Sequence, residues 1–195
     1  IAPGLIMLTA INNSYSNVAS SSFGAKFQHD VEELQVSPVS NLLIISGYIA
    51  GGIARGVFVG VIVTIVTLFF TSISIHNFFL MTLIFLLTSA VFSLAGFINA
   101  IYANSFDDIS IIPTFVLTPL TYLGGIFYSV SLLPAFWEKL SYFNPILYMV
   151  NGFRYSMLGT SDISIGWTLA LLSTLLLGLF YFANYLMNRG TGLKY

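Results

Sequence analysis

The chain has 195 residues, of which 57% are apolar and only 7% are charged, whereas a soluble domain carries about 25% charged residues. So little charge excludes a soluble globular domain, and so much apolar surface excludes a chain that stays disordered in water. The formal net charge of −1 and the absence of cysteine exclude a basic nucleic-acid-binding surface, a disulfide framework and a thiolate metal site.

Long uncharged runs predict an integral membrane protein with five crossings. A helix needs about 20 mostly apolar residues to cross a hydrocarbon layer of about 30 Å. Long runs without Asp, Glu, Lys or Arg include 1–25, 56–106, 109–137 and 163–188. Because the second run is long enough for two crossings, the predicted transmembrane helices are 1–23, 55–73, 78–103, 109–130 and 165–187. The sequence therefore predicts an all-α polytopic helical bundle that forms a single transmembrane domain over 1–195.

The ends of these helices predict an orientation. The sequence begins with Ile1, inside an apolar run and without a charged leader region, so we expect further chain before it. Basic residues near helix ends favour the cytoplasmic side. One side carries Lys26, Arg55, Arg189 and Lys194, and the other carries Lys139 and Arg154. This difference places the 24–41 loop, the 104–108 turn and the C-terminus in the cytoplasm.

Residues 24–41 contain a predicted short amphipathic helix. Phe27, Val31 and Leu34 are spaced as one helical stripe. The other faces carry the acidic residues Asp30, Glu32 and Glu33, and Pro38 ends the helix. Anionic lipid attracts basic helices rather than acidic ones, whereas an amphipathic helix of this kind suits a groove on a partner protein. A solvated loop with an incidental stripe is the alternative.

Small residues repeat in the second predicted span. Gly52, Gly56 and Gly60 recur every four residues, so one helix face lacks side chains. Such faces allow close contact between helix backbones in lipid, and we favour this packing role over a substrate-binding role. Arg55 is expected at the end of this span, where its side chain can reach the cytoplasmic interface.

Polar residues also form stripes inside two predicted spans. Asn13, Asn17 and Ser20 lie on one face of the first helix, and Thr114, Thr118, Thr121 and Tyr122 follow in the fourth. Pro113 and Pro119 predict a kink in that fourth helix. Both stripes are candidates for lining a translocation pathway, and hydrogen bonding between helices is the alternative.

The absence of several residue types and motifs from the sequence argues against some transport mechanisms. No Asp, Glu or Lys lies in the middle of a predicted span, which argues against a proton relay or a carboxylate ion site. No phosphate-binding G-x-x-x-x-G-K-[ST] motif is present. His29 and His76 are isolated, so no metal site is predicted. If the protein moves a substrate uphill, the energy comes from another polypeptide.

Residues 131–160 predict a re-entrant hairpin on the outer side. The uncharged stretch from Leu140 to Phe153 has only 14 residues, about 20 Å of helix, which is too short to cross. Pro134 and Pro145 interrupt helices there. The region is also rich in Trp and Tyr, which suit the headgroup level. A sixth, tilted crossing is the alternative.

Several of these features together resemble the ABC-2 type permease family, and in particular the export permeases of Gram-negative inner membranes. The matching features are a helix containing Pro119, an aromatic Gly-rich exit over 122–128, a Leu-Pro turn at Pro134, Asn144-Pro145, Arg154 and Gly159. Residues 32–40 are similar to the cytoplasmic coupling segment of that family.

The resemblance implies a permease subunit of an ATP-binding cassette exporter in the bacterial inner membrane. Family members have six transmembrane helices, so the chain corresponds to helices two to six, and segment 24–41 to the coupling helix. The expected partners are a second permease copy and a separate ABC ATPase that carries ATP and Mg, so this chain itself needs no cofactor and is not an enzyme. The expected substrate is amphiphilic, and is lipid-like, saccharide or drug-like. A stand-alone secondary transporter or channel, and a membrane anchor for an ATPase, are the rival functions.

Overall fold

The structure is a computed structural model, and it describes residues 2–28, 39–71, 75–128, 130–160 and 163–190. Within these ranges all regular secondary structure is helical. The helices are α1 (Ala2–Phe27), α3 (Asn41–Leu68), α4 (Phe78–Tyr102), α5 (Phe106–Ile112), the π-helical turn η1 (Pro113–Leu117), α6 (Thr118–Leu123), the 3₁₀ turn η2 (Val130–Leu132), α7 (Ala135–Ser141), α8 (Pro145–Leu158) and α9 (Ile165–Arg189).

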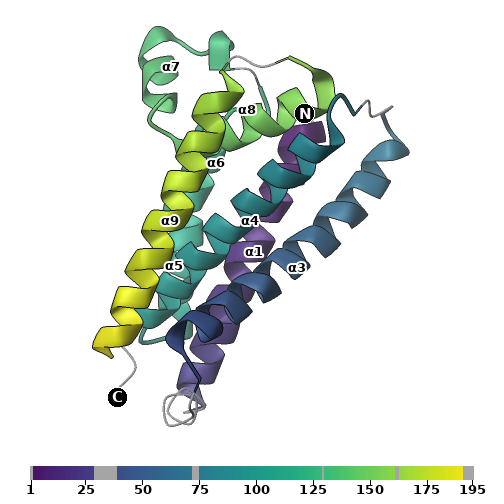
Figure 1. The fold of residues 1–195 in the computed structure, drawn as a ribbon. Coiled ribbons are helices and arrows are strands. Elements are labelled where there is room, and N and C mark those ends of the chain that lie inside the picture. The colour runs from purple at the N-terminus through teal and green to yellow at the C-terminus, as the bar shows by residue number, and fades with distance from the viewer. Residues whose placement is uncertain (1, 29–38, 72–74, 129, 161–162, 191–195) are drawn as a thin grey trace.

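The long helices run in alternating directions along one bundle (Figure 1). From the end that carries α7 and α8, the helices α1, α4 and α9 run towards the other end, and α3 and the α5–η1–α6 segment run back. We call the end with α7 and α8 the hairpin end and the opposite end the Lys26 end. α1 packs against both α3 and α4 and forms the centre of the bundle.

Hydrogen bonds to backbone carbonyls tie the helices together at both ends. At the hairpin end, the N–H groups of His76 and Asn77 donate to the carbonyls of Met157 and Ser156, at 3.2 and 2.8 Å. At the other end, Lys26 Nζ donates to the carbonyl of Ala103 at 2.8 Å and also to that of Ile101. Orphan carbonyls at the C-terminal ends of α8 and α4 are thereby satisfied.

Three described helices are long and apolar enough to cross a membrane, namely α3, α4 and α9. The prediction of an all-helical membrane protein is therefore confirmed, whereas five crossings are not. α1 has 26 residues but carries many Asn and Ser side chains that lower its hydropathy. The α5–η1–α6 segment is broken into short pieces.

The bounds of the predicted helix over 109–130 are wrong, because the helical residues run from Phe106 to Leu123 and include a π-helical turn that begins at Pro113. Pro113 has no N–H and cannot bond to the carbonyl of Ile109; the side-chain amide of Asn99 on α4 donates to that carbonyl instead, at 3.2 Å. A π-helical turn follows, and α6 then ends at Leu123. Gly125 next adopts a φ of +69°, which favours glycine.

Other helix limits also differ from the prediction. α1 continues to Phe27, and α3 begins at Asn41 and ends at Leu68. The limits of α4 and α9 agree with the predicted 78–103 and 165–187 to within two residues. Because α3 starts early, Arg55 lies 14 residues after its first residue and 13 before its last. The expectation that Arg55 lies at the end of its helix is therefore wrong.

Residues 131–160 fold into α7 and α8 at the hairpin end (Figure 1). Asn144 caps α8 by accepting from the N–H of Ile146 at 3.0 Å, and Pro145 takes the first helical position. The Asn144 amide also donates to the carbonyl of Leu120 at 2.6 Å. The Arg154 guanidinium donates to the carbonyl of Gly125, also at 2.6 Å. Both side chains thereby fasten α8 to the end of α6.

The three predicted small residues of α3 lie at its contact with α1 and α4. A Cβ atom built on Gly52 would collide with Ser93 Oγ and would come within 2.6 Å of Val18 Cγ2. One on Gly56 would collide with Ser14 Oγ, and one on Gly60 would lie 2.6 Å from Phe85 Cζ. These glycines therefore set the distance between α3 and its neighbours.

The adjacent residues Gly51 and Gly52 provide a matched test of this packing. Gly52→Ala should destabilise the protein by about 1–3 kcal/mol because the added methyl overpacks the helix contact. Gly51→Ala meets only Asn17 Nδ2 at 3.9 Å, so it should be neutral or stabilising by up to about 1 kcal/mol through helix propensity. The measurement is thermal unfolding of the full-length detergent-solubilised protein. Equal melting temperatures for the two variants would contradict the close packing at Gly52.

Candidate functional site

One face of α1 is polar and lies at the surface of the described structure. Its exposed or half-buried residues include Asn12, Asn13, Ser16, Asn17, Ser20 and Ser21, which we call the polar face of α1. The apolar residues of α1, such as Ile11, Tyr15 and Val18, are buried in the bundle. Polar groups inside a membrane face the bundle interior or a water-filled cavity, because contact with lipid is costly. The polar face therefore marks a surface that meets water, protein or a polar ligand.

Arg55 of α3 binds to this polar face. Its Nη1 donates to Asn17 Oδ1 at 3.2 Å. Wherever a crossing of about 20 residues is placed within α3, Arg55 stays at least about five residues inside it. An arginine at the centre of a membrane helix costs about 2.5–3.5 kcal/mol on insertion scales, so such residues commonly have functional roles.

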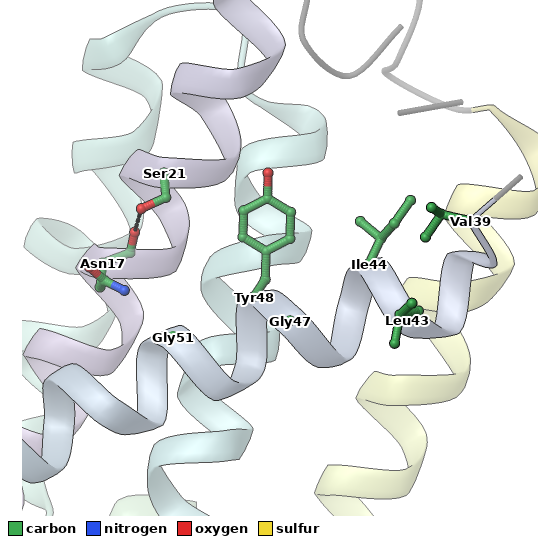
Figure 2. Close-up of a pocket in the computed structure, with 8 residues that line it drawn as sticks. All are labelled: Asn17, Ser21, Val39, Leu43, Ile44, Gly47, Tyr48 and Gly51. Carbon is green, nitrogen blue, oxygen red and sulfur yellow. Dashed lines mark hydrogen bonds between the residues drawn. The ribbon is translucent and has the colours of Figure 1, made fainter. Parts of the chain in front are cut away.

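A pocket lies between the polar face of α1 and the first half of α3 (Figure 2). Its volume is about 430 Å³, and α1 contributes Asn17 and Ser21, joined by a hydrogen bond. The opposite wall is formed by Val39, Leu43, Ile44, Gly47, Tyr48 and Gly51. A Cβ atom on Gly47 would meet no atom within 4 Å. This part of α3 therefore leaves space beside α1, in contrast to the packed face around Gly56.

A second cavity is lined by Arg55 and by serines of the polar face of α1, and we call it the α1–α5 groove. It has a volume of about 550 Å³. Its lining residues are Tyr15, Ser16, Ser20, Arg55, Phe106, Asp107, Ile109, Ser110, Pro113 and Thr114. Ligand sites commonly have this size and a mixed lining of apolar residues with a few polar groups. The groove joins the polar face of α1 to the start of the α5–η1–α6 segment.

Neighbouring carboxylates at the groove have different roles. Asp108 forms a capping box with Ser105, and its Oδ2 accepts from the backbone N–H groups of Asn104 and Ser105 at 2.9 and 3.0 Å. The bond from Asn104, together with those from Ser105, holds the pKa of Asp108 below its usual range. Asp107 lines the groove instead. Sequence reasoning missed Asp107, although its position directly beside a capping residue was a usable signal.

The predicted pathway residues are only partly brought together. Ser20 and Thr114 line the same groove, and Asn17 lies beside it as the partner of Arg55. Asn13 donates to the carbonyl of Thr9 in its own helix at 2.9 Å. Thr118 is exposed.

The other two predicted pathway residues lie on different faces of α6. Thr121 is buried and donates to the carbonyl of Thr118 at 2.7 Å. Tyr122 is exposed, and its carbonyl accepts from Tyr128 Oη at 2.6 Å. The two residues therefore do not share one exposed stripe with Thr114.

Most of the predicted coupling segment lies outside the described residues. This applies to Asp30, Val31, Glu32, Glu33, Leu34 and Pro38. Phe27 is described and is the last residue of α1. Its ring centroid lies 5.7 Å from that of Phe106, which itself lies 4.8 Å from Phe23 in an edge-to-face contact. The base of the segment therefore packs against the start of α5, next to the α1–α5 groove.

The described residues contain no group of three or more His, Cys, Asp or Glu side chains that could hold a metal ion. The groove instead combines one cationic and one anionic side chain with hydroxyls and apolar surface. Such an arrangement can hold a polar or charged group of a ligand next to its apolar part.

Comparison with known proteins identifies the family. Residues 1–158 match the ABC-2 type transporter family. The chain is 52% identical over 194 residues to the "Inner membrane transport permease YadH" of Escherichia coli strain K12, and equally to that of Shigella flexneri. These alignments cover 100% of the chain and 76% of each relative. A transport permease is not itself an enzyme. The chain therefore belongs to the ABC-2 type transporter family and is a helical multi-pass protein of the inner membrane.

Proposed function

We propose that this chain is the transmembrane permease subunit of an ABC exporter, which moves an amphiphilic substrate outwards across the inner membrane. The observation that carries the proposal is the polar face of α1, which is exposed beside the α1–α5 groove in a chain with only 7% charged residues. Lipid-like, saccharide and drug-like molecules all combine apolar and polar parts that suit such a groove.

The proposal includes two further crossings, α1 and the α5–η1–α6 segment. α1 has 26 residues, which give about 39 Å of helix. Both elements extend between the two ends of the bundle (Figure 1). Polar faces and broken helices are tolerated at membrane depth where they line a water-filled cavity or are buried in protein. With one additional helix before Ile1, the full protein would have six crossings.

ABC-2 permeases normally pair with an ABC ATPase, and we propose such a partner with its ATP and Mg, together with a second permease copy. Segment 24–41 would act as the coupling helix, and each ATPase state would favour one permease form through differential contacts. Lys26 bonds to the end of α4, and Phe27 packs on Phe106. A movement of the segment would therefore reach the wall of the α1–α5 groove directly.

A proton-driven secondary transporter is less well supported. The ionisable group within α3 is Arg55, and a guanidinium does not give up its proton in proteins. An ATP-driven partner supplies the energy without a titrating residue in the membrane.

The coupling segment provides the first test of this function. Replacing both Glu32 and Glu33 with Lys should weaken association with the ATPase by about tenfold or more, because like charges then meet across the contact. The measurement is co-purification of the ATPase with affinity-tagged full-length permease. Glu138→Lys, on α7 at the other end of the bundle, is the control and should leave association unchanged. Failure of the wild-type permease to retain any ATPase, or full retention by the double variant, would contradict the proposal.

The orientation can be tested with single cysteines, because the chain has none of its own. Lys139→Cys on α7 and Gln28→Cys after α1 lie at opposite ends of the bundle. In intact cells, an impermeant thiol reagent should label Lys139→Cys, whereas Gln28→Cys should be labelled only after the cells are opened. Labelling of both from the same side would contradict a hairpin that stays on the outer side.

A further inference from the structure

We infer that the α1–α5 groove binds the headgroup of a zwitterionic amphiphile, with the anionic group of the ligand at Arg55 and its amine at Asp107. This inference rests on the proposed transport of an amphiphilic substrate and adds the charge pattern of that substrate. The shared chemistry is one phosphate or carboxylate and one ammonium group next to an apolar part.

Arg55 supplies the anion-binding part of the groove. Within the described part of the chain, its hydrogen bonding is limited to the 3.2 Å contact with Asn17 Oδ1. A guanidinium has five N–H donors in a planar fork that fits phosphate and carboxylate oxygens. The contact with Asn17 fixes the direction of the side chain, and the remaining donors can bind a ligand in the groove.

Asp107 supplies the matching negative charge. The capping bonds at the start of α5 are made by its neighbour Asp108, so the carboxylate of Asp107 is not used for helix capping. Among the described residues, no ion pair joins Asp107 to Arg55, although both line the groove. A purely anionic ligand would be repelled by Asp107 and a purely cationic one by Arg55. A ligand with both charges satisfies both side chains.

The remaining lining explains why the ligand is amphiphilic. Phe106, Ile109 and Pro113 provide apolar surface on the α5 side, and Ser16 and Ser20 provide hydroxyls on the α1 side. The volume of about 550 Å³ accommodates a headgroup and the first part of an apolar chain rather than a complete lipid. The rest of the ligand's apolar chain would extend out of the groove along the apolar helices of the protein.

The test measures equilibrium binding of three probes to the full-length permease in detergent, without ATPase or nucleotide. The probes are short-chain phosphatidylethanolamine, which is zwitterionic, short-chain phosphatidylglycerol, which is anionic, and glycerophosphoethanolamine, which has no acyl chain. The wild type should prefer phosphatidylethanolamine to phosphatidylglycerol by about tenfold and should bind glycerophosphoethanolamine more weakly than the acylated zwitterion.

Two variants test which side chain recognises the ammonium group of the ligand and which recognises its anionic group. Asp107→Asn should abolish the preference by weakening phosphatidylethanolamine binding, whereas Arg55→Gln should weaken binding of both lipid probes. Glu138→Gln and Lys139→Gln on α7 make the same changes of charge away from the groove and should behave as wild type. Thermal unfolding identifies variants that fail to fold, and Asp107→Asn alone decides the proposal if Arg55→Gln is unstable.

Three results would overturn the inference. These are equal binding of both lipids by the wild type, an unchanged preference in Asp107→Asn, and binding of glycerophosphoethanolamine as tight as that of the acylated probe. Because no ATPase is present, these results concern the headgroup alone. Failure of the wild-type permease to retain any ATPase in the coupling experiment would instead contradict the permease function and leave the binding data intact.

Discussion

The central constraint on this protein is that α1 must satisfy two environments at once. Its apolar residues are buried against α3 and α4, where Gly52, Gly56 and Gly96 allow the backbones to approach closely. Its opposite face carries amides and hydroxyls that lipid would not accommodate. The close packing fixes the position of α1, and the polar face then defines where water or a ligand must lie. The groove beside α5 follows from this arrangement.

Side chains also replace the backbone hydrogen bonds that are lost where the helical structure is interrupted. The side chain of Asn99 donates to the carbonyl of Ile109, which Pro113 leaves without its helical partner. In the same way, Asn144 donates to the carbonyl of Leu120 and Arg154 to that of Gly125. An unsatisfied carbonyl in a bilayer costs several kcal/mol, so these residues make the interrupted α5–η1–α6 segment possible. They also explain in physical terms why Asn-Pro and Arg follow the proline-bearing helix in the sequence.

The sequence predicted the elements that depend on local composition. The limits of α4 and α9 follow from long uncharged runs bounded by polar residues. The uncharged stretch 140–153 predicted a short helix, and α8 spans Pro145–Leu158. The predicted transmembrane helix began at 55 because Arg55 was taken as its limit, whereas α3 begins at Asn41. Partnering of Arg55 with Asn17 is a tertiary contact, and no local pattern indicates it. Asp107 differs, because its place directly before the capping residue Asp108 is a local signal, but its position in the groove depends on the fold of the α4–α5 turn.

The central claim is that the polar face of α1 meets an aqueous pathway, and the reactivity of three serines in this one helix tests it most directly. Ser16 and Ser20 lie on the polar face, whereas Ser14 is completely buried. Each is replaced by cysteine in the full-length reconstituted protein, and its rate of reaction with a charged, hydrophilic thiol reagent is measured. The account predicts rapid reaction at Ser16→Cys and Ser20→Cys and almost none at Ser14→Cys. Equally slow reaction at all three positions would show that the polar face is covered by lipid or protein, and would contradict the account.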